Sequence, residues 1–99
     1  MKYSVKNKYN SDDEKCRKFR PNDIVRHFKG NLYRIIAFAT NTETGTLEVI
    51  YESLYGEYEK RNVWSRPYEM FASKVDLQKY PSATQEYRFE IVEIQNVLN

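Results

Sequence analysis

The chain has 99 residues, of which 40% are hydrophobic and 30% charged, a composition typical of one globular domain. Its single cysteine excludes an intrachain disulfide and a zinc site built from several cysteines of one chain. No apolar run approaches the roughly 20 residues of a membrane helix, and no signal-peptide pattern opens the chain. We therefore expect a soluble, cytoplasmic protein with no membrane partner.

Charge is distributed unevenly along the chain. Residues 1–22 carry seven basic and three acidic side chains, whereas residues 23–99 carry nine and eleven. Because the first segment is also poor in large apolar residues, we predict a flexible or loosely docked extension over 1–22 and a single small β domain over 23–99. The acidic-then-basic order of residues 11–18 would also suit a short helix. The slightly acidic domain lacks the charge expected of a duplex-binding protein.

Two strands joined by a tight turn open the predicted domain. The strands cover residues 24–28 and 32–40, and the chain reverses at Lys29-Gly30-Asn31, where glycine has no Cβ and asparagine tolerates positive φ. Strict alternation in the second strand places Tyr33, Ile35, Ala37 and Ala39 on one face and Leu32, Arg34, Ile36 and Phe38 on the other. Because both faces are largely apolar, this strand is predicted to be central.

The later elements are shorter. A polar loop over 41–45 precedes a strand over 46–53, and a charged connection over 54–62 follows. Val63 and Trp64 begin a short strand that Pro67 must end or confine to an edge. Helical spacing of apolar residues predicts one or two helical turns over 67–75, and alternation returns in a final strand over 87–94.

These elements predict a mainly β fold: a small SH3-like barrel, or a strongly bent antiparallel sheet with one short helical turn. An open antiparallel sheet with a helix on one face is the alternative.

Several motifs occur in an order that resembles a known family. They are His27-Phe28-Lys29-Gly30-Asn31-Leu32-Tyr33, Ala39 with Thr42-Glu43-Thr44, Val49-Ile50-Tyr51 with Leu54-Tyr55-Gly56, and Trp64-Ser65-Arg66-Pro67 with Met70-Phe71. Over residues 24–90 the chain is similar to the bacterial family called domain of unknown function 1653. The resemblance implies a short, soluble protein or module and no enzymatic role. The link from Gly56 to Trp64 is longer than in the family, and residues 1–22 are an addition.

The residues themselves also argue against catalysis. His27 is the only histidine, so a metal site or acid–base pair made of two histidines cannot form within one chain. No nucleophile motif and no phosphate-binding glycine loop is present. Glu57 and Glu59 lie beside Lys60 and Arg61, as expected of a solvated loop. We predict a protein that is not an enzyme and uses no metal or cofactor.

A candidate binding face includes Trp64 and Arg66, which are two residues apart on an extended segment and so share a face, with Tyr55 brought near by the preceding loop. An aromatic ring beside a guanidinium can hold a flat, anionic or peptidic ligand. The alternative is that Trp64 fills the core and that Arg66 forms an ion pair or caps the turn at Pro67. His27, Lys29 and Tyr33, with Arg66, are further candidates that would line one end of the predicted barrel.

Two functional classes follow. The first is a non-catalytic module that holds a peptide, protein or small ligand on the face of Tyr55, Trp64 and Arg66. The second is a binder of single-stranded nucleic acid, which stacks bases on tyrosines and contacts phosphates through Lys60, Arg61 and the basic tail. Salt separates them, because phosphate contacts weaken steeply as salt rises.

Overall fold

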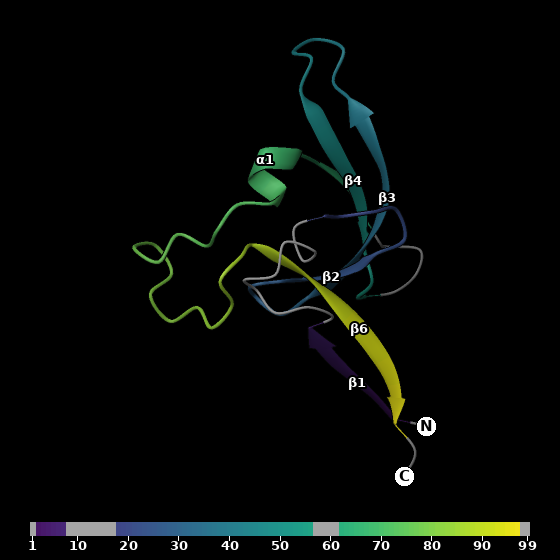
Figure 1. Ribbon diagram of the computed structural model, residues 1–99, viewed down its shortest axis with the longest axis vertical. Coiled ribbons are helices and arrows are strands. Elements are labelled where there is room, and N and C mark those ends of the chain that lie inside the picture. Colours follow the sequence, from purple (N-terminus) through teal and green to yellow (C-terminus); the bar gives the residue numbers. More distant parts are fainter. Residues whose placement is uncertain (1, 8–17, 57–61, 98–99) are drawn as a thin grey trace.

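The computed structural model describes residues 2–7, 18–56 and 62–97. It contains β1 (Lys2–Asn7), β2 (Ile24–His27), β3 (Leu32–Thr40), β4 (Leu47–Ser53), β5 (Val63–Pro67), α1 (Tyr68–Phe71) and β6 (Phe89–Val97). All strand pairings are antiparallel, and the order across the sheet is β1-β6-β2-β3-β4-β5 (Figure 1). The predicted strands are confirmed, and β3 has the bounds expected from its sequence.

The reversal between β2 and β3 depends on Gly30. Its φ of +108° lies in a region that residues with a Cβ rarely adopt. The Gly30 N–H donates to the His27 carbonyl at 2.7 Å, and the His27 N–H donates to the Asn31 carbonyl at 2.9 Å. This turn pairs Val25 with Tyr33 and so confirms the predicted antiparallel ribbon.

A β-bulge in β3 corrects the predicted faces of this strand. Ile35 pairs with Tyr51, but the next pairs are Ala37 with Ile50 and Phe38 with Val49, so Ile36 is an extra residue. The alternation therefore shifts by one position, and Phe38, not Ala37, packs with Ile35 against the core. Strict period-two alternation is wrong beyond Ile35 because a bulge changes the face of every later side chain.

The sheet is strongly bent and open. In the described part of the chain β1 and β5 are its outer strands, each with one hydrogen-bonded neighbour. β5 ends at Pro67, which has no N–H to donate, and the chain turns into α1 instead of continuing a ladder. Of the two predicted forms, the strongly bent antiparallel sheet is confirmed, and the sheet is not closed into a barrel.

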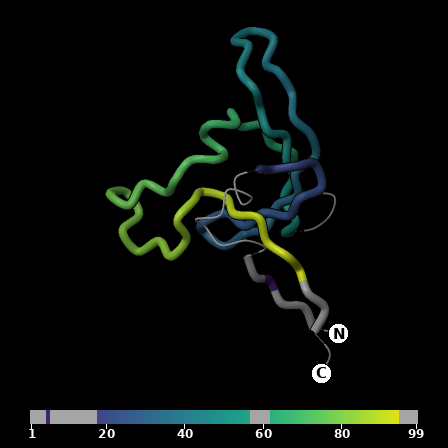
Figure 2. Tube along the Cα trace, viewed as in Figure 1, coloured from purple at the N-terminus to yellow at the C-terminus, as the bar shows by residue number. Residues whose placement is uncertain are grey.

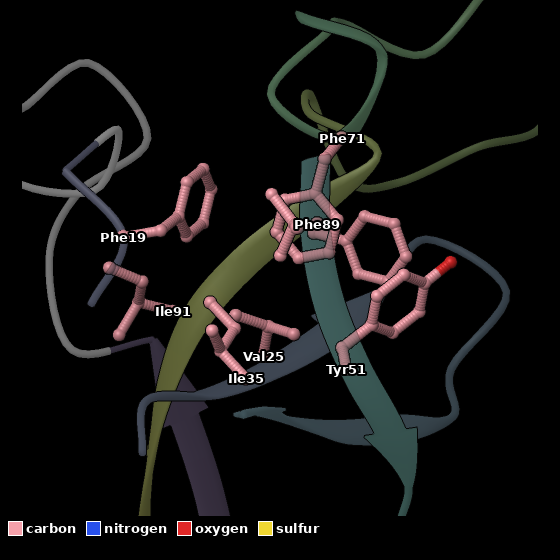
Figure 3. Packing of buried hydrophobic residues seen from close by; sticks show 8 residues of the cluster. Phe19, Val25, Ile35, Tyr51, Phe71, Phe89 and Ile91 are labelled. Carbon is pink, nitrogen blue, oxygen red and sulfur yellow. The ribbon is translucent and has the colours of Figure 1, made fainter. Parts of the chain in front are cut away.

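The core lies where α1 packs against the sheet. Phe71 of α1 is fully buried and stacks on Phe89 of β6 at 4.1 Å between ring centroids, with an interplanar angle of 6°. Phe19 meets Phe71 edge-on at 5.0 Å, and Val25 and Ile35 are buried below these rings (Figure 3). The predicted helical turn is confirmed. Within the described residues, no helix has the length and apolar character needed to cross a membrane.

Two structural features of the segment before residue 23 were not predicted from the sequence. β1 pairs with β6 from Lys2↔Val97 to Asn7↔Val92, and Phe19 is only 6% exposed within the core. The division at residue 22 stays a prediction, but described parts of the first segment contact the domain. The helix proposed over 11–18 falls almost wholly outside the described residues.

A long connection between α1 and β6 leaves the sheet and returns to it (Figure 2). Gln85 anchors its end: the side-chain amide donates to the carbonyls of Arg26 and Tyr87 at 2.8 and 2.9 Å and accepts a bond from Arg26 Nε at 3.0 Å. Because the side chain is only 7% exposed, these bonds replace water and hold the loop against β2.

Candidate binding site

One pocket of about 190 Å³ gathers side chains from five strands. It is lined by His27 of β2, Tyr33 of β3, Tyr51 of β4, Trp64 and Arg66 of β5, Phe89 of β6, and Tyr55, which follows β4. The strand register explains the gathering, because Tyr51 lies opposite Trp64 and His27 lies opposite Phe89. The volume is below the roughly 300–1,000 Å³ of drug-sized sites and suits one side chain or one ring.

Trp64 and Arg66 share a face of β5, as their spacing predicts. Arg66 Nε donates to the Tyr51 hydroxyl at 3.2 Å, and Trp64 is 42% exposed. Trp64 therefore does not fill the core, and that interpretation is wrong. Among the residues that the structure describes, no carboxylate pairs with Arg66. Its guanidinium is positioned by the Tyr51 hydroxyl and lines the pocket.

Three tyrosines form a connected group beside this guanidinium. The hydroxyls of Tyr33 and Tyr55 are 3.3 Å apart, and the Tyr33 ring meets those of Tyr55 and Tyr51 edge-on at 5.6 and 5.5 Å. Burial, and then the hydrogen bond to Tyr55, raise the pKa of Tyr33 well above its ordinary value. The hydroxyl of Tyr33 is therefore protonated at physiological pH. Figure 3 shows the hydroxyl oxygen of Tyr51 directed away from the core cluster to which its ring belongs.

His27 forms the inner wall of the pocket. Its ring packs edge-on against Phe89 at 5.0 Å, and its Nδ1 accepts a hydrogen bond from the Lys29 backbone N–H at 3.1 Å. Burial, followed by the positive charges of Arg66, Arg88 and Lys29, lowers the pKa of His27 to about 4. The ring is neutral at physiological pH, and because Nδ1 accepts, we assign its proton to Nε2.

Comparison with known proteins identifies the family. Residues 23–91 match the family described as Protein of unknown function (DUF1653). The chain belongs to the DUF1653 family. A crystal structure of a DUF1653 protein from Bordetella bronchiseptica is similar, with a TM-score of 0.60 and 28% identity over 76% of this chain and 88% of that one. No curated protein matches the chain. The resemblance noted in the sequence is confirmed for the family, and bacterial origin stays a prediction.

In this DUF1653 chain, five of the six predicted site residues line the pocket: His27, Tyr33, Tyr55, Trp64 and Arg66. Lys29 is not among the lining residues. Its ammonium lies 5.2 Å from the Tyr80 ring centroid, and its bond to His27 comes from the backbone. The Lys29 ammonium therefore lies near Tyr80 and not in the pocket.

Sequence reasoning missed two lining residues, Tyr51 and Phe89. Both lie within strands predicted from the sequence, and both contribute to the core. A signal was present in Tyr51, whose hydroxyl needs a partner when its ring is buried. The described residues contain no group of three or more histidine, cysteine or carboxylate side chains placed to hold a metal ion.

Proposed function

We propose that this DUF1653 protein is a non-catalytic module that binds a peptide, protein or small ligand through the pocket of Tyr33, Tyr51, Tyr55, Trp64 and Arg66. The observation that carries the proposal is the guanidinium of Arg66, bonded to a neutral tyrosine within a pocket that has exposed aromatic rings. Arginine and tryptophan are the residue types most enriched at the energetic centres of interfaces.

The exposure of the pocket residues supports binding over a purely structural role. Tyr55 and Trp64 are 44% and 42% exposed, although each ring could gain by burial against other apolar atoms. An incoming ring or side chain would cover both surfaces at once. Catalysis has no comparable support, because the described lining residues include no serine, threonine, cysteine or carboxylate for His27 to act with.

The test is a nuclear magnetic resonance screen with a panel of single-ring aromatic fragments and short peptides of positive, neutral and negative charge. We expect saturable shifts at the backbone amides of Tyr55 and Arg66. Trp64→Ala should weaken binding by about 1–3 kcal/mol, the range for loss of one stacked aromatic, and should keep a cooperative melt. Val63→Ala is the matched control, because Val63 neighbours Trp64, is 62% exposed and does not line the pocket.

Two results would contradict the proposal: a panel in which no probe moves these amides, or a Trp64→Ala variant that binds as well as the parent chain. A variant that loses its cooperative melt would show that Trp64 stabilises the fold, and Tyr55→Ala would then decide whether the aromatic surface binds.

Binding of single-stranded nucleic acid is the second candidate, favoured by two exposed rings beside an arginine. Lys60 and Arg61, which would contact phosphates, lie outside the described residues, as does most of the basic tail. An oligothymidine whose affinity falls steeply with salt would favour this candidate, and an affinity that barely responds to salt would favour the first. The cytoplasmic location stays a prediction from the sequence.

A further inference from the structure

The polar atoms that line the pocket are mostly hydrogen-bond donors. Arg66 uses Nε for Tyr51, so the N–H groups on both Nη atoms have no partner among the described residues. The Tyr51 hydroxyl accepts that bond and can donate its own hydrogen. The N–H groups at Trp64 Nε1 and His27 Nε2 can each donate a hydrogen bond and cannot accept one.

The tyrosine pair adds one more donor. The hydroxyls of Tyr33 and Tyr55 share a single hydrogen bond, so one of their two hydrogens is left for another acceptor. The group that best satisfies the pocket is therefore rich in acceptors.

The charge of the pocket has one sign. None of the described lining residues is acidic, whereas Arg66 contributes a full positive charge. Burial, and then the positive charges of Arg66, Arg88 and Lys29, lower the pKa of His27, so these three cations disfavour a further positive charge at this wall of the pocket.

The positive charge of Arg66 favours an anionic ligand over a cationic one, although aromatic rings alone could bind either. A cluster of tyrosine and tryptophan rings can enclose a cation, because the ring faces are electron-rich. A second cation here would lie beside Arg66 with no carboxylate among the lining residues to offset the repulsion. A carboxylate instead receives charge-assisted bonds from the guanidinium and further bonds from the hydroxyls.

We propose that the pocket binds a carboxylate attached to a flat body, with Arg66 as its charge partner and the rings of Trp64 and Tyr55 beside that body. The inference rests on the proposed function and names its ligand class. The carboxylate could belong to a small molecule or to the C-terminus of a peptide.

The test uses three probes of nearly equal size and shape: benzoate, benzamide and benzamidinium, each titrated by calorimetry into the full chain. Benzoate should bind about tenfold or more tightly than benzamide, and benzamidinium should bind most weakly. Arg66→Gln should abolish the preference for benzoate. Arg66→Lys, which keeps the charge but not the planar fork, should retain part of it.

Arg20→Gln is the matched control, since it removes the same charge from an exposed residue outside the pocket and should leave the preference unchanged. A melt of each variant verifies folding, and if Arg66→Gln does not fold, Arg66→Lys decides the question by its reduced preference. A preference as large in Arg66→Lys as in the parent chain would overturn the role of the guanidinium fork.

The three probes distinguish a pocket that does not prefer carboxylates from a pocket that binds no ligand. Equal binding of benzamide, or tightest binding of benzamidinium, overturns the carboxylate inference while the pocket remains a binding site. No binding by any of the three, together with a silent peptide panel, overturns the proposed function as well. Acetyl-Ala-Phe with a free or an amidated C-terminus then identifies the source: a preference for the free acid indicates peptide termini, and a preference shown by benzoate alone indicates a small molecule.

Discussion

Replacing His27 with asparagine should remove an acid-sensitive contribution to stability. In the folded chain, burial and three nearby cations lower the pKa of His27 from 6.5 to about 4. Between these two values the unfolded chain binds a proton that the folded chain does not, so acid favours unfolding and stability rises with pH across this window. Above the unfolded value the ring is neutral in both states, and its titration has no effect.

The magnitude follows from the difference between the two pKa values. For a fully buried ring the difference would correspond to about 3 kcal/mol. Because His27 lines an open pocket, solvent screening reduces the expected contribution to about 1–2 kcal/mol. Asparagine is the suitable replacement, since its Oδ1 can accept the Lys29 N–H bond that Nδ1 accepts now, without titrating.

The assay is urea unfolding of both chains at a series of pH values from about 8 to about 4. The carboxylates titrate in this range too, so the relevant quantity is the parent free energy of unfolding minus that of His27→Asn. This difference should be constant above about pH 7 and fall by about 1–2 kcal/mol toward pH 4. A difference that does not change with pH, or a His27 titration midpoint near 6.5 in the folded chain, would refute the reasoning.

Two further predictions concern stability. Phe71→Ala should lower the free energy of urea unfolding by about 3–5 kcal/mol, because it removes a fully buried ring stacked on Phe89. Met70→Ala on the same helix should change it by no more than about 0.5 kcal/mol, because Met70 is 48% exposed. Equal losses in the two variants would contradict the packing described. Gln85→Ala should cost about 1–3 kcal/mol, because it removes a buried amide that donates to the carbonyls of Arg26 and Tyr87 and accepts from Arg26 Nε. Gln85→Glu, which has no amide N–H, should not recover this stability. A neutral effect of Gln85→Ala in thermal melts would show that the long connection is held by other contacts.

The sequence was sufficient for elements whose cause is local. Gly30 supplies the positive φ of the reversal, Pro67 ends a strand because it has no N–H, and the helical spacing around Phe71 describes one apolar face. The site residues Trp64 and Arg66 were found for the same reason, since residues two apart on a strand share a face.

Features that depend on distant partners could not be found in this way. The bulge at Ile36 is defined only by the strand opposite, and its effect on Phe38 is therefore invisible in the pattern of β3 alone. β1 is polar and gains its structure from pairing with β6, and the place of Tyr51 in the pocket becomes evident only once β5 is known to pair with β4.

The most direct test of the central claim is the indole N–H signal of Trp64. The chain has a single tryptophan, so labelling with ¹⁵N-tryptophan gives one indole signal, located at the pocket. We expect benzoate to move this signal saturably and benzamide to do so only at higher concentration. A signal that stays in place with benzoate, benzamide and benzamidinium alike would contradict the claim that this pocket binds a flat carboxylate.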